Sequence, residues 1–296
     1  MSTPALSAAS AIWWLHSLRN HLAPAPCPVC GGTHRRLLLR RDRYLLPVDI
    51  SVCETCGCVH CARQLSEADS SFFYSRIYPA LMGIGTSRLT NESAAAKAHA
   101  SYRLRRMRAV IGPLSDILEI GSGFGHFLAA CACEGIGPLQ GVEPGGASSE
   151  AARTREGLAA VISTTPFLQT PPPPFTPRIV AMFHVLEHVA DPVATLARVA
   201  DWIAPDGWLV LEVPDILGDW GKMGVQNFHL SHRSYFSADT LGRLLDQTGF
   251  HSVVVERESD DFIYPGNLRI FARRRADAGR APQPKPDVDA IVQHVR

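Results

Sequence analysis

Two acids and a run of glycines have the types and the spacing that a nucleoside cofactor needs. Residues 117–128 predict a buried strand, a glycine turn and the first turn of a helix. Gly121 and Gly123 leave the turn without side chains, so a cofactor can sit directly on the backbone. A second predicted strand, residues 139–144, ends with Glu143, at an offset of about twenty residues that places a carboxylate near a ribose diol. The leading hypothesis is therefore a cofactor that contains a nucleoside.

The glycine spacing distinguishes between cofactors. Glycines 121, 123 and 125 follow the pattern G-x-G-x-G, whereas a dinucleotide fold uses G-x-G-x-x-G to seat a pyrophosphate at a helix N-terminus. Glu119 lies just before the turn, where it would repel a pyrophosphate but attract an ammonium group. S-adenosylmethionine carries an ammonium, a sulfonium and a ribose and has no phosphate, so it is the predicted cofactor. The alternative is a tight strand–helix turn that binds nothing.

The glycine turn and four later segments resemble a known enzyme family. The pattern E-x-G-x-G-x-G from Glu119 to Gly125 resembles the first motif of class I S-adenosylmethionine-dependent methyltransferases, and residues 141–144 resemble the second. The string H-V-L-E-H-V-A-D-P at 184–192, the segment at 204–214 and the H-x-x-Y-F-S stretch at 232–237 resemble later motifs. The resemblance spans roughly residues 110–275 and implies a methyltransferase.

The resemblance assigns roles to individual residues. His184 ends a predicted strand and is expected to line the methyl-donor pocket. The chain is similar to bacterial sugar C-methyltransferases of natural-product and surface-polysaccharide pathways, in which a histidine at the place of His232 is proposed as the general base. A glutamate precedes that histidine in the family, whereas Ser231 does so here. The expected catalytic residues are His232, His184 and His229. The expected cofactor-binding residues are Glu119, Gly121, Ser122, Gly123, Gly125, Glu143, Pro144 and His184.

A metal ion is an alternative role for the segment that follows His184. Some members of the superfamily hold a divalent cation with a Glu-x-x-Glu-His arrangement, and here His184, Glu187 and His188 stand at those positions. A helical turn would place the three side chains on one face. The preferred interpretation is that Glu187 and His188 are architectural and bind loop amides.

Two C-x-x-C-G turns near the N-terminus predict a structural zinc site. Each turn directs two thiolates at one centre, and four thiolates close a tetrahedral zinc site. Cys58 and Cys61 form another C-x-x-C, so either is an alternative ligand, whereas Cys131 and Cys133 are expected to be buried thiols. The expected ligands are Cys27, Cys30, Cys53 and Cys56. This segment resembles the zinc-binding segment that precedes certain bacterial methyltransferases, in which aromatic residues approach the cofactor and substrate. Tyr74 or Tyr78 would do so here, and the alternative is that they pack in the core.

Strands and helices alternate along the rest of the chain, which predicts an α/β fold: a doubly wound, Rossmann-like, mostly parallel seven-stranded sheet with a small N-terminal zinc ribbon. The predicted strands cover residues 117–120, 139–144, 158–162, 178–183, 208–214, 252–256 and 268–272. The predicted helices cover residues 93–111, 124–134, 147–156, 192–203 and 238–248. The predicted domains are an N-terminal segment (1–24), a zinc ribbon (25–65), a helical lid or linker (66–112), a methyltransferase domain (113–275) and a flexible tail (276–296).

The composition argues against nucleic-acid binding and against a membrane span. The formal net charge is +1, so the chain does not have the large excess of positive charge that is typical of nucleic-acid-binding proteins. No apolar run has the length of a membrane span, and no export signal is recognised, so a cytoplasmic location with reduced cysteines is expected. Residues 8–22 predict a short amphipathic helix docked on the domain.

The predicted function is O- or C-methylation of a small molecule or a glycan precursor. One alternative is an RNA methyltransferase that uses the ribbon arginines at 35, 36, 40, 41 and 43. Another is a catalytically degenerate methyltransferase fold that only binds a cofactor or a partner. Folds host many functions, so the acceptor itself does not follow from the sequence.

Overall fold

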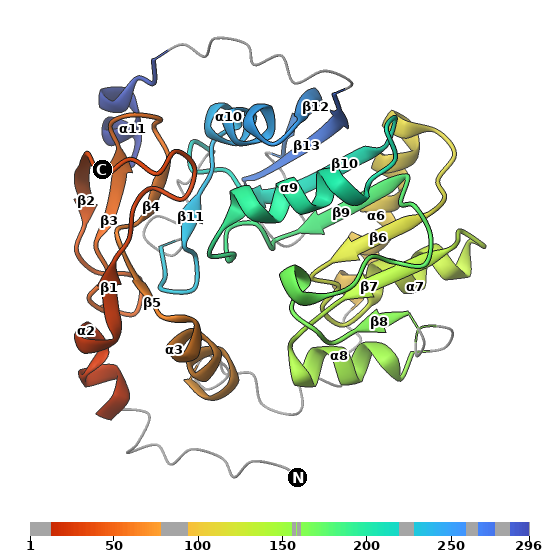
Figure 1. The fold of residues 1–296 in the computed structure, drawn as a ribbon, viewed down its shortest axis with the longest axis horizontal. Coiled ribbons are helices and arrows are strands. Elements are labelled where there is room, and N and C mark those ends of the chain that lie inside the picture. The colour runs from red at the N-terminus through yellow and green to blue at the C-terminus, as the bar shows by residue number, and fades with distance from the viewer. Residues whose placement is uncertain are drawn as a thin grey trace.

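The computed structural model describes residues 13–77, 94–155, 158, 161–218, 228–258, 266–275 and 285–295. Figure 1 shows a large sheet with helices on both faces and, beside it, a smaller β layer built mainly from the N-terminal part. The large sheet has seven strands, most of them parallel, so the predicted fold class is confirmed.

The large sheet has the strand order β12-β13-β10-β9-β6-β7-β8. Only β13 runs antiparallel to its neighbours among the described strands of this sheet. Of the described residues in the third predicted strand, Ile162 lies in β8 and pairs with β7, whereas Leu158 is a buried side chain beside the glycine turn. The strands are β6 (Ile117–Ile120), β7 (Leu139–Val142), β8 (Ile162–Ser163), β9 (Ile179–Phe183), β10 (Trp208–Pro214), β12 (Phe250–Arg257) and β13 (Asn267–Arg274).

The pleat of the central strands divides the apolar side chains between two cores. Ile117 and Ile179 pack with α6, α7 and α8, whereas their neighbours Leu118 and Val180 pack with α9 and α10 on the other face. In Figure 1, α9 and α10 lie in front of the sheet. The helices are α6 (Ala94–Ile111), α7 (His126–Cys133), α8 (Gly146–Arg153), α9 (Pro192–Trp202) and α10 (Ala238–Gln247), with a short 3₁₀ turn η2 (Phe167–Gln169). These bounds agree with the predicted helices to within three residues.

The direction of strand addition reverses between β6 and β9. From β6 the chain proceeds to β7 and β8 on one side, and β9 and β10 then add on the other side. In open α/β sheets such a switch point leaves a crevice at the carboxyl ends of the strands, where ligands bind. The residues that follow β6, β7 and β9 therefore meet at one edge.

The smaller sheet joins the N-terminal ribbon to the segment that follows β10. Its order is β11-β4-β3-β2, and β11 comes from the segment that follows β10. Ser234 of β11 pairs with His60 of β4. The ribbon therefore fixes the position of residues near 234. The strands are β2 (Arg35–Leu39), β3 (Ile50–Cys53), β4 (Val59–Cys61) and β11 (Ser234–Tyr235), and a two-stranded sheet pairs β1 (Leu22–Pro24) with β5 (Arg63–Leu65).

Both ends of the described chain pack on the ribbon. Residues 13–21 are helical around a turn, with α2 at Leu18–His21, and Trp14 and Leu18 are buried, as the sequence predicted. Two further helical turns, α3 (Glu67–Phe72) and η1 (Phe73–Ile77), follow the ribbon. Among the described residues, no helix combines the length and apolar character that crossing a membrane requires.

The prediction of a flexible tail is wrong for the last described residues. They form α11 (Val288–Val295), which lies against the ribbon near β3 (Figure 1). Ile291 and Val292 are buried in the ribbon core, and Arg36 forms an ion pair with Asp289 at 2.5 Å. The apolar positions of α11 cover ribbon surface that the ribbon alone cannot bury, whereas the prolines before the helix suggested disorder.

Candidate functional site

The glycine turn after β6 has a backbone that side chains rarely adopt. Gly121, Gly123 and Gly125 have φ values of +72°, +51° and +74°. A Cβ atom on Gly121 would overlap Cγ2 of Val185, and one on Gly125 would lie 3.0 Å from Cδ1 of Leu158. At Gly123, by contrast, no atom of the described residues lies within 4 Å of the Cβ position. Side chains therefore pack against the turn at Gly121 and Gly125, whereas the turn is open at Gly123, as the binding of a ligand requires.

Two buried polar groups beside the turn lack partners. Within the described part of the chain, Oε2 of Glu119 and Oγ of Ser122 have no hydrogen-bond partner, although the residues are only 3% and 5% exposed. Burial raises the pKa of Glu119 to about 8, which the positive charge of Arg103 partly opposes and the charge of Glu143 reinforces. An unpaired buried carboxyl is costly, and a cationic ligand group would compensate it.

Glu143 lies opposite the turn at the end of β7. Its carboxylate accepts hydrogen bonds from the backbone N–H groups of Gly123 and Gly145, both at 2.8 Å. Burial raises the pKa of this carboxyl, and the two hydrogen bonds oppose the rise. The adjacent Pro144 is exposed. Glu143 thus holds the open glycine from one side, at the carboxyl end of the strand next to β6.

His184 follows β9 with a φ of +55°, which is unusual for a residue with a side chain. Its Nδ1 lies 3.5 Å from Oε1 of Glu187, and its Nε2 lies 3.3 Å from Oε1 of Glu212. Burial opposes the charged form, but the hydrogen bonds and charges of the two glutamates outweigh it and raise the pKa of His184 to about 9. At neutral pH this imidazole therefore carries a proton already.

An ion-pair network behind His184 is a feature that the sequence analysis missed. Glu212 on β10 is 1% exposed and binds Arg269 of β13 and Arg103 of α6. Despite burial, the charges of Arg103, His184 and Arg269 hold the pKa of Glu212 well below its usual range. A charged glutamate inside an apolar strand needs buried partners. The position of Glu212 within the apolar segment 208–214 was therefore the sequence signal that could have indicated this network.

Three further imidazoles gather beside Glu187. The ring centroids of His229 and His232 are 3.7 Å apart, and those of His188 and His232 are 4.7 Å apart. Burial, followed by the nearby positive charges, lowers the pKa of His229 to about 2 and that of His232 well below its usual value. Both rings are therefore neutral at neutral pH. The structure brings together His229 and His232, which were expected to be catalytic, and adds His188.

The loop that carries these histidines is fastened to the turn after β9. The N–H groups of Arg233 and Ser234 donate to the carbonyl oxygen of Glu187 at 2.7 and 3.2 Å, and His188 Nδ1 lies 2.8 Å from the carbonyl oxygen of Ser231. Residues 184–188 form a non-helical turn, in contrast to the helical arrangement considered from the sequence.

Residues of the ribbon form hydrogen bonds to the same loop from the other side. Cys61 Sγ donates to the carbonyl oxygen of His232 at 3.2 Å, and the N–H of Leu230 donates to Oδ2 of Asp42 at 3.0 Å. Burial raises the pKa of Cys61 to about 12, so it is a thiol. The position of the histidines therefore depends on the ribbon. Tyr78 lies outside the described residues, as does the side chain of Tyr74, so the expectation for these two tyrosines stays a prediction.

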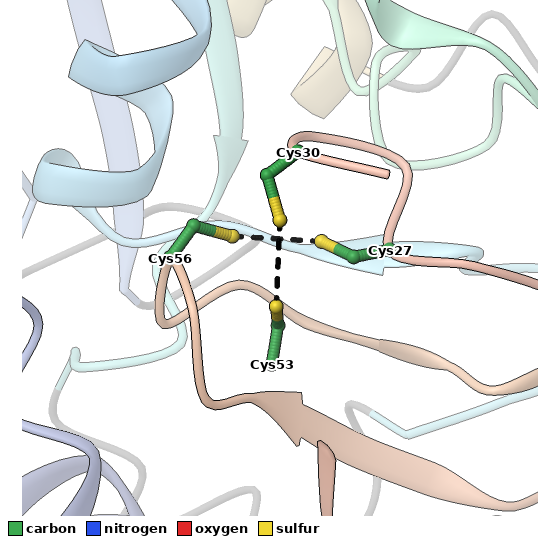
Figure 2. Close-up of side chains that lie close together, drawn as sticks. All are labelled: Cys27, Cys30, Cys53 and Cys56. Atoms are coloured by element: carbon green, nitrogen blue, oxygen red, sulfur yellow. Dashed lines mark hydrogen bonds between the residues drawn. The ribbon is translucent and has the colours of Figure 1, made fainter. Parts of the chain in front are cut away.

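The four expected cysteine ligands converge at the tip of the ribbon. Figure 2 shows their sulfur atoms pointing at a common centre, with 3.5 Å between those of Cys27 and Cys56 and 3.5 Å between those of Cys30 and Cys53. All four sulfur atoms lie within 4.8 Å of one another. Hydrogen bonds from Cys53 and Cys56 hold the pKa of Cys27 well below its usual range.

The remaining cysteines are placed differently from one another. Cys58 is fully buried beside the cluster, and its hydrogen bond with Cys27, followed by burial, raises the pKa of its thiol. Cys131 is buried in α7 as expected, but Cys133 at the end of that helix is exposed, which corrects the prediction for this residue. The helix presents only one of the two positions to the core, since residues two apart lie on different faces.

Comparisons with known proteins agree with this arrangement. A family model described as a methyltransferase domain matches residues 94–255. A search of curated proteins found no match. Among solved structures, 1,6-didemethyltoxoflavin-N1-methyltransferase from Burkholderia thailandensis, with bound 1,6-didemethyltoxoflavin and S-adenosylhomocysteine, is 17% identical with a TM-score of 0.53, over 74% of this chain and 95% of that chain. Magnesium protoporphyrin IX methyltransferase from Synechocystis PCC 6803, with bound S-adenosylhomocysteine, is 14% identical with a TM-score of 0.51, over 70% and 98%. At these identities the likeness concerns the fold.

Proposed function

The chain belongs to the class I S-adenosylmethionine-dependent methyltransferases, and on this premise we propose that it methylates an oxygen or carbon atom of a small molecule or glycan precursor. The observation that carries the proposal is the open glycine turn at the switch point, with an unpaired buried carboxyl beside it. The two similar enzymes named above act on small molecules, 1,6-didemethyltoxoflavin and magnesium protoporphyrin IX. The near-zero net charge of the chain also favours a small acceptor over a nucleic acid.

The residues around the turn fit S-adenosylmethionine, which supplies a methyl group already activated on a sulfonium. Glu119 would pair with the ammonium group, and the N–H groups and Oγ of Ser122 in the turn would hold the methionine portion. Glu143 would bind the ribose hydroxyls. His184 stands at the adjacent edge, beside the place expected for the methyl group, and Pro144 borders the nucleoside side.

The acceptor would lie against the imidazoles of His229 and His232. Methyl transfer is an in-line displacement, so the protein mainly has to orient the acceptor and provide for the loss of its proton. His184 already carries a proton, which makes it a charged positioning group rather than a base. His232 is the proposed proton acceptor, since its ring is neutral and His229 lies against it.

The proposal includes a structural zinc ion at Cys27, Cys30, Cys53 and Cys56. Four thiolates bound to zinc at about 2.3 Å form a tetrahedron with edges of roughly 3.8 Å, and the 3.5 Å sulfur distances are close to that value. A site with four protein ligands has no open position for a substrate, so the ion would stabilise the ribbon and take no part in the reaction.

Calorimetric titration of the zinc-loaded protein with S-adenosylmethionine tests the proposal. We expect binding to S-adenosylmethionine and none to NAD, because the turn has the spacing G-x-G-x-G and lacks the G-x-G-x-x-G spacing that seats a pyrophosphate. A screen of small hydroxylated acceptors, including nucleotide sugars, would follow, with S-adenosylhomocysteine release as the readout. A folded protein that binds no S-adenosylmethionine would refute the proposal.

Replacing Glu143 with alanine is expected to weaken S-adenosylmethionine binding about 10- to 100-fold, because hydrogen bonds to a charged group contribute roughly 1.5–3 kcal/mol. Titration calorimetry measures the change. Glu143→Gln keeps one carbonyl acceptor and should show an intermediate loss. Glu150→Ala, which removes an exposed carboxylate from α8, is the matched control. Equal affinity of Glu143→Ala and the unaltered protein would remove Glu143 from the site.

Binding of S-adenosylmethionine is expected to release a proton from Glu119 at pH 7. The pKa of Glu119 is about 8 in the cofactor-free protein, and pairing with an ammonium would favour the carboxylate. Affinity should therefore rise with pH up to about 8, by at most tenfold per unit. The same shift makes the cofactor-free protein less stable as pH rises from 4.5 towards 8, because the native state holds this proton more tightly than the unfolded chain does.

Calorimetry in buffers of different ionisation enthalpy counts the released proton. Glu119→Gln should bind the cofactor more weakly and with a heat that no longer depends on the buffer. A buffer-independent heat for the unaltered protein would contradict the assignment of the ammonium to Glu119.

A further inference from the structure

We infer that Glu187, His188 and His232 form a second metal site, which binds a divalent transition-metal ion on the acceptor side. One ligand atom from each of these residues lies within 4.8 Å of the others. The turn after β9 and the loop before β11 each contribute to the site, so sequence spacing alone does not reveal it. The three residues differ from the trio considered from the sequence, because His232 takes the place of His184.

The unusual state of Glu187 is the first reason for this inference. Its side chain is almost completely buried, yet within the described residues neither carboxylate oxygen has a hydrogen-bond partner. The nearest charged group is the ring of His184, with Nδ1 at 3.5 Å from Oε1. The charge of Glu187 is therefore balanced only by a histidine ring at the 3.5 Å limit of a hydrogen bond, and a bound cation would occupy lone pairs of this buried carboxylate that accept nothing closer.

The orientation of His188 is the second reason. Nδ1 of this ring faces the carbonyl oxygen of Ser231 at 2.8 Å, so in the neutral tautomer that donates this bond Nε2 carries the lone pair. Nε2 lies 4.0 Å from Oε1 of Glu187. Metal-binding histidines commonly donate their other ring N–H to a backbone carbonyl, which fixes the ring. His188 is thus held in the orientation that a ligand needs.

The spacing of the donor atoms fits one ion. Two donors that each bind an ion at about 2.1 Å lie at most about 4.2 Å apart. The Glu187–His188 separation of 4.0 Å is within this limit, and the widest pair, within 4.8 Å, meets it after a small side-chain rotation. Two imidazoles and one carboxylate suit zinc, iron, cobalt or manganese, and three protein ligands leave coordination positions open.

The location next to the cofactor turn indicates what the open positions would bind. Val185 lies between His184 and Glu187 in sequence and packs directly on Gly121. An ion held by Glu187 therefore lies beside the place proposed for the methyl donor. This step rests on the proposed function: the ion would bind an acceptor with two neighbouring oxygen atoms, such as a vicinal diol or an α-hydroxy carbonyl compound.

The reaction at such a site would be O-methylation. The ion lowers the pKa of the bound hydroxyl, whose proton leaves to solvent. The alkoxide oxygen then forms a bond to the methyl carbon, the carbon–sulfur bond breaks, and its electron pair stays on sulfur as the thioether of S-adenosylhomocysteine. His232 would in this case donate its lone pair to the ion instead of accepting a proton from the acceptor.

Cobalt titration of the full-length protein tests the site. The ribbon is first loaded with one equivalent of zinc, and Co²⁺ is then added in the absence of acceptor. We expect one Co²⁺ per chain, with the visible absorption of nitrogen and oxygen ligands and without the thiolate-to-cobalt charge-transfer band of cysteine ligands. Glu187→Gln and His232→Ala should each weaken Co²⁺ binding at least ~10-fold. His16→Gln, which changes an exposed histidine, is the control.

Thermal unfolding of the same samples distinguishes a loss of Co²⁺ binding from a loss of folding. Without Co²⁺, the melting temperature shows whether each variant is folded; Glu187→Gln loses the ion pair with His184 but places a neutral amide in the buried position, so it should stay folded. Co²⁺ should raise the melting temperature of the unaltered protein and of His16→Gln, but not that of the variants at Glu187 and His232. If Glu187→Gln does not fold, His188→Gln and His232→Ala carry the test. Absence of Co²⁺ binding, or equal binding by the variants, overturns the inference.

Titration with S-adenosylmethionine separates the two proposals. A protein that binds S-adenosylmethionine but no Co²⁺ refutes the metal site and leaves the proposed function intact. A protein that binds Co²⁺ but no S-adenosylmethionine refutes the proposed function and leaves the metal site standing without its assigned reaction.

Discussion

Replacement of Gly121 with alanine is expected to abolish measurable S-adenosylmethionine binding and to destabilise the protein. A side chain at φ = +72° costs roughly 1–2 kcal/mol, and a methyl group that overlaps Val185 adds about 1–3 kcal/mol of packing strain. The backbone can relieve this strain only by moving the turn away from β9, which would displace the N–H groups proposed to hold the cofactor. Denaturant unfolding and titration calorimetry measure the two effects.

Two further variants separate backbone strain from steric overlap. Gly121→Ala combined with Val185→Ala removes the overlap and should recover part of the stability, while the cost of the positive φ stays. Gly146→Ala is the control, because this position at the start of α8 has no described atom within 4 Å of the Cβ position and no positive φ. A Gly121→Ala protein with unchanged stability and unchanged affinity would show that the turn tolerates a side chain and would remove the basis of the cofactor assignment.

Replacement of Cys53 and Cys56 with serine is expected to remove the ribbon metal and to stop turnover. Apparent free energies of zinc binding at structural sites are about 10–16 kcal/mol, which is comparable to the whole stability of a domain. The cysteine tip also packs into the large core, where Gln247 Nε2 of α10 donates to the carbonyl oxygen of Val29 at 2.8 Å. We therefore expect loss of one zinc per chain and a large fall in melting temperature, measured by metal analysis and calorimetry.

The position of the histidine loop is the physical reason for the loss of turnover. The loop depends on the pairing of β11 with β4 and on the bonds from Cys61 and Asp42, all of which belong to the ribbon. The residues that would hold the cofactor lie on β6 and β7, so S-adenosylmethionine binding should survive better than turnover. Treating the unaltered protein with a chelator should reproduce this difference. Cys133→Ser, at an exposed cysteine, is the control. Unchanged metal content and melting temperature in the double variant would contradict the zinc assignment.

Features that depend on neighbours in sequence were predictable. The glycine turn follows from three glycines directly after an apolar strand, and each helix of the large domain was expected to within three residues. The cysteine pairs are likewise local, since each C-x-x-C-G turn directs two sulfur atoms by its own backbone. The sequence alone thus determined the fold class, the edge of the sheet proposed for a ligand, and the four sulfur atoms that meet at one centre.

Features that depend on distant segments were decided only by the tertiary structure. The pair Glu212–Arg269 joins two strands whose register is set by the whole sheet. Helix α11 packs on ribbon residues that lie more than 200 positions earlier in the chain. His188 and His232 meet only because β11 pairs with the ribbon and turns its loop towards β9. Local sequence records the conformational preference of each segment, whereas the assembly of buried charges and metal-binding side chains depends on which surfaces the folded chain brings into contact.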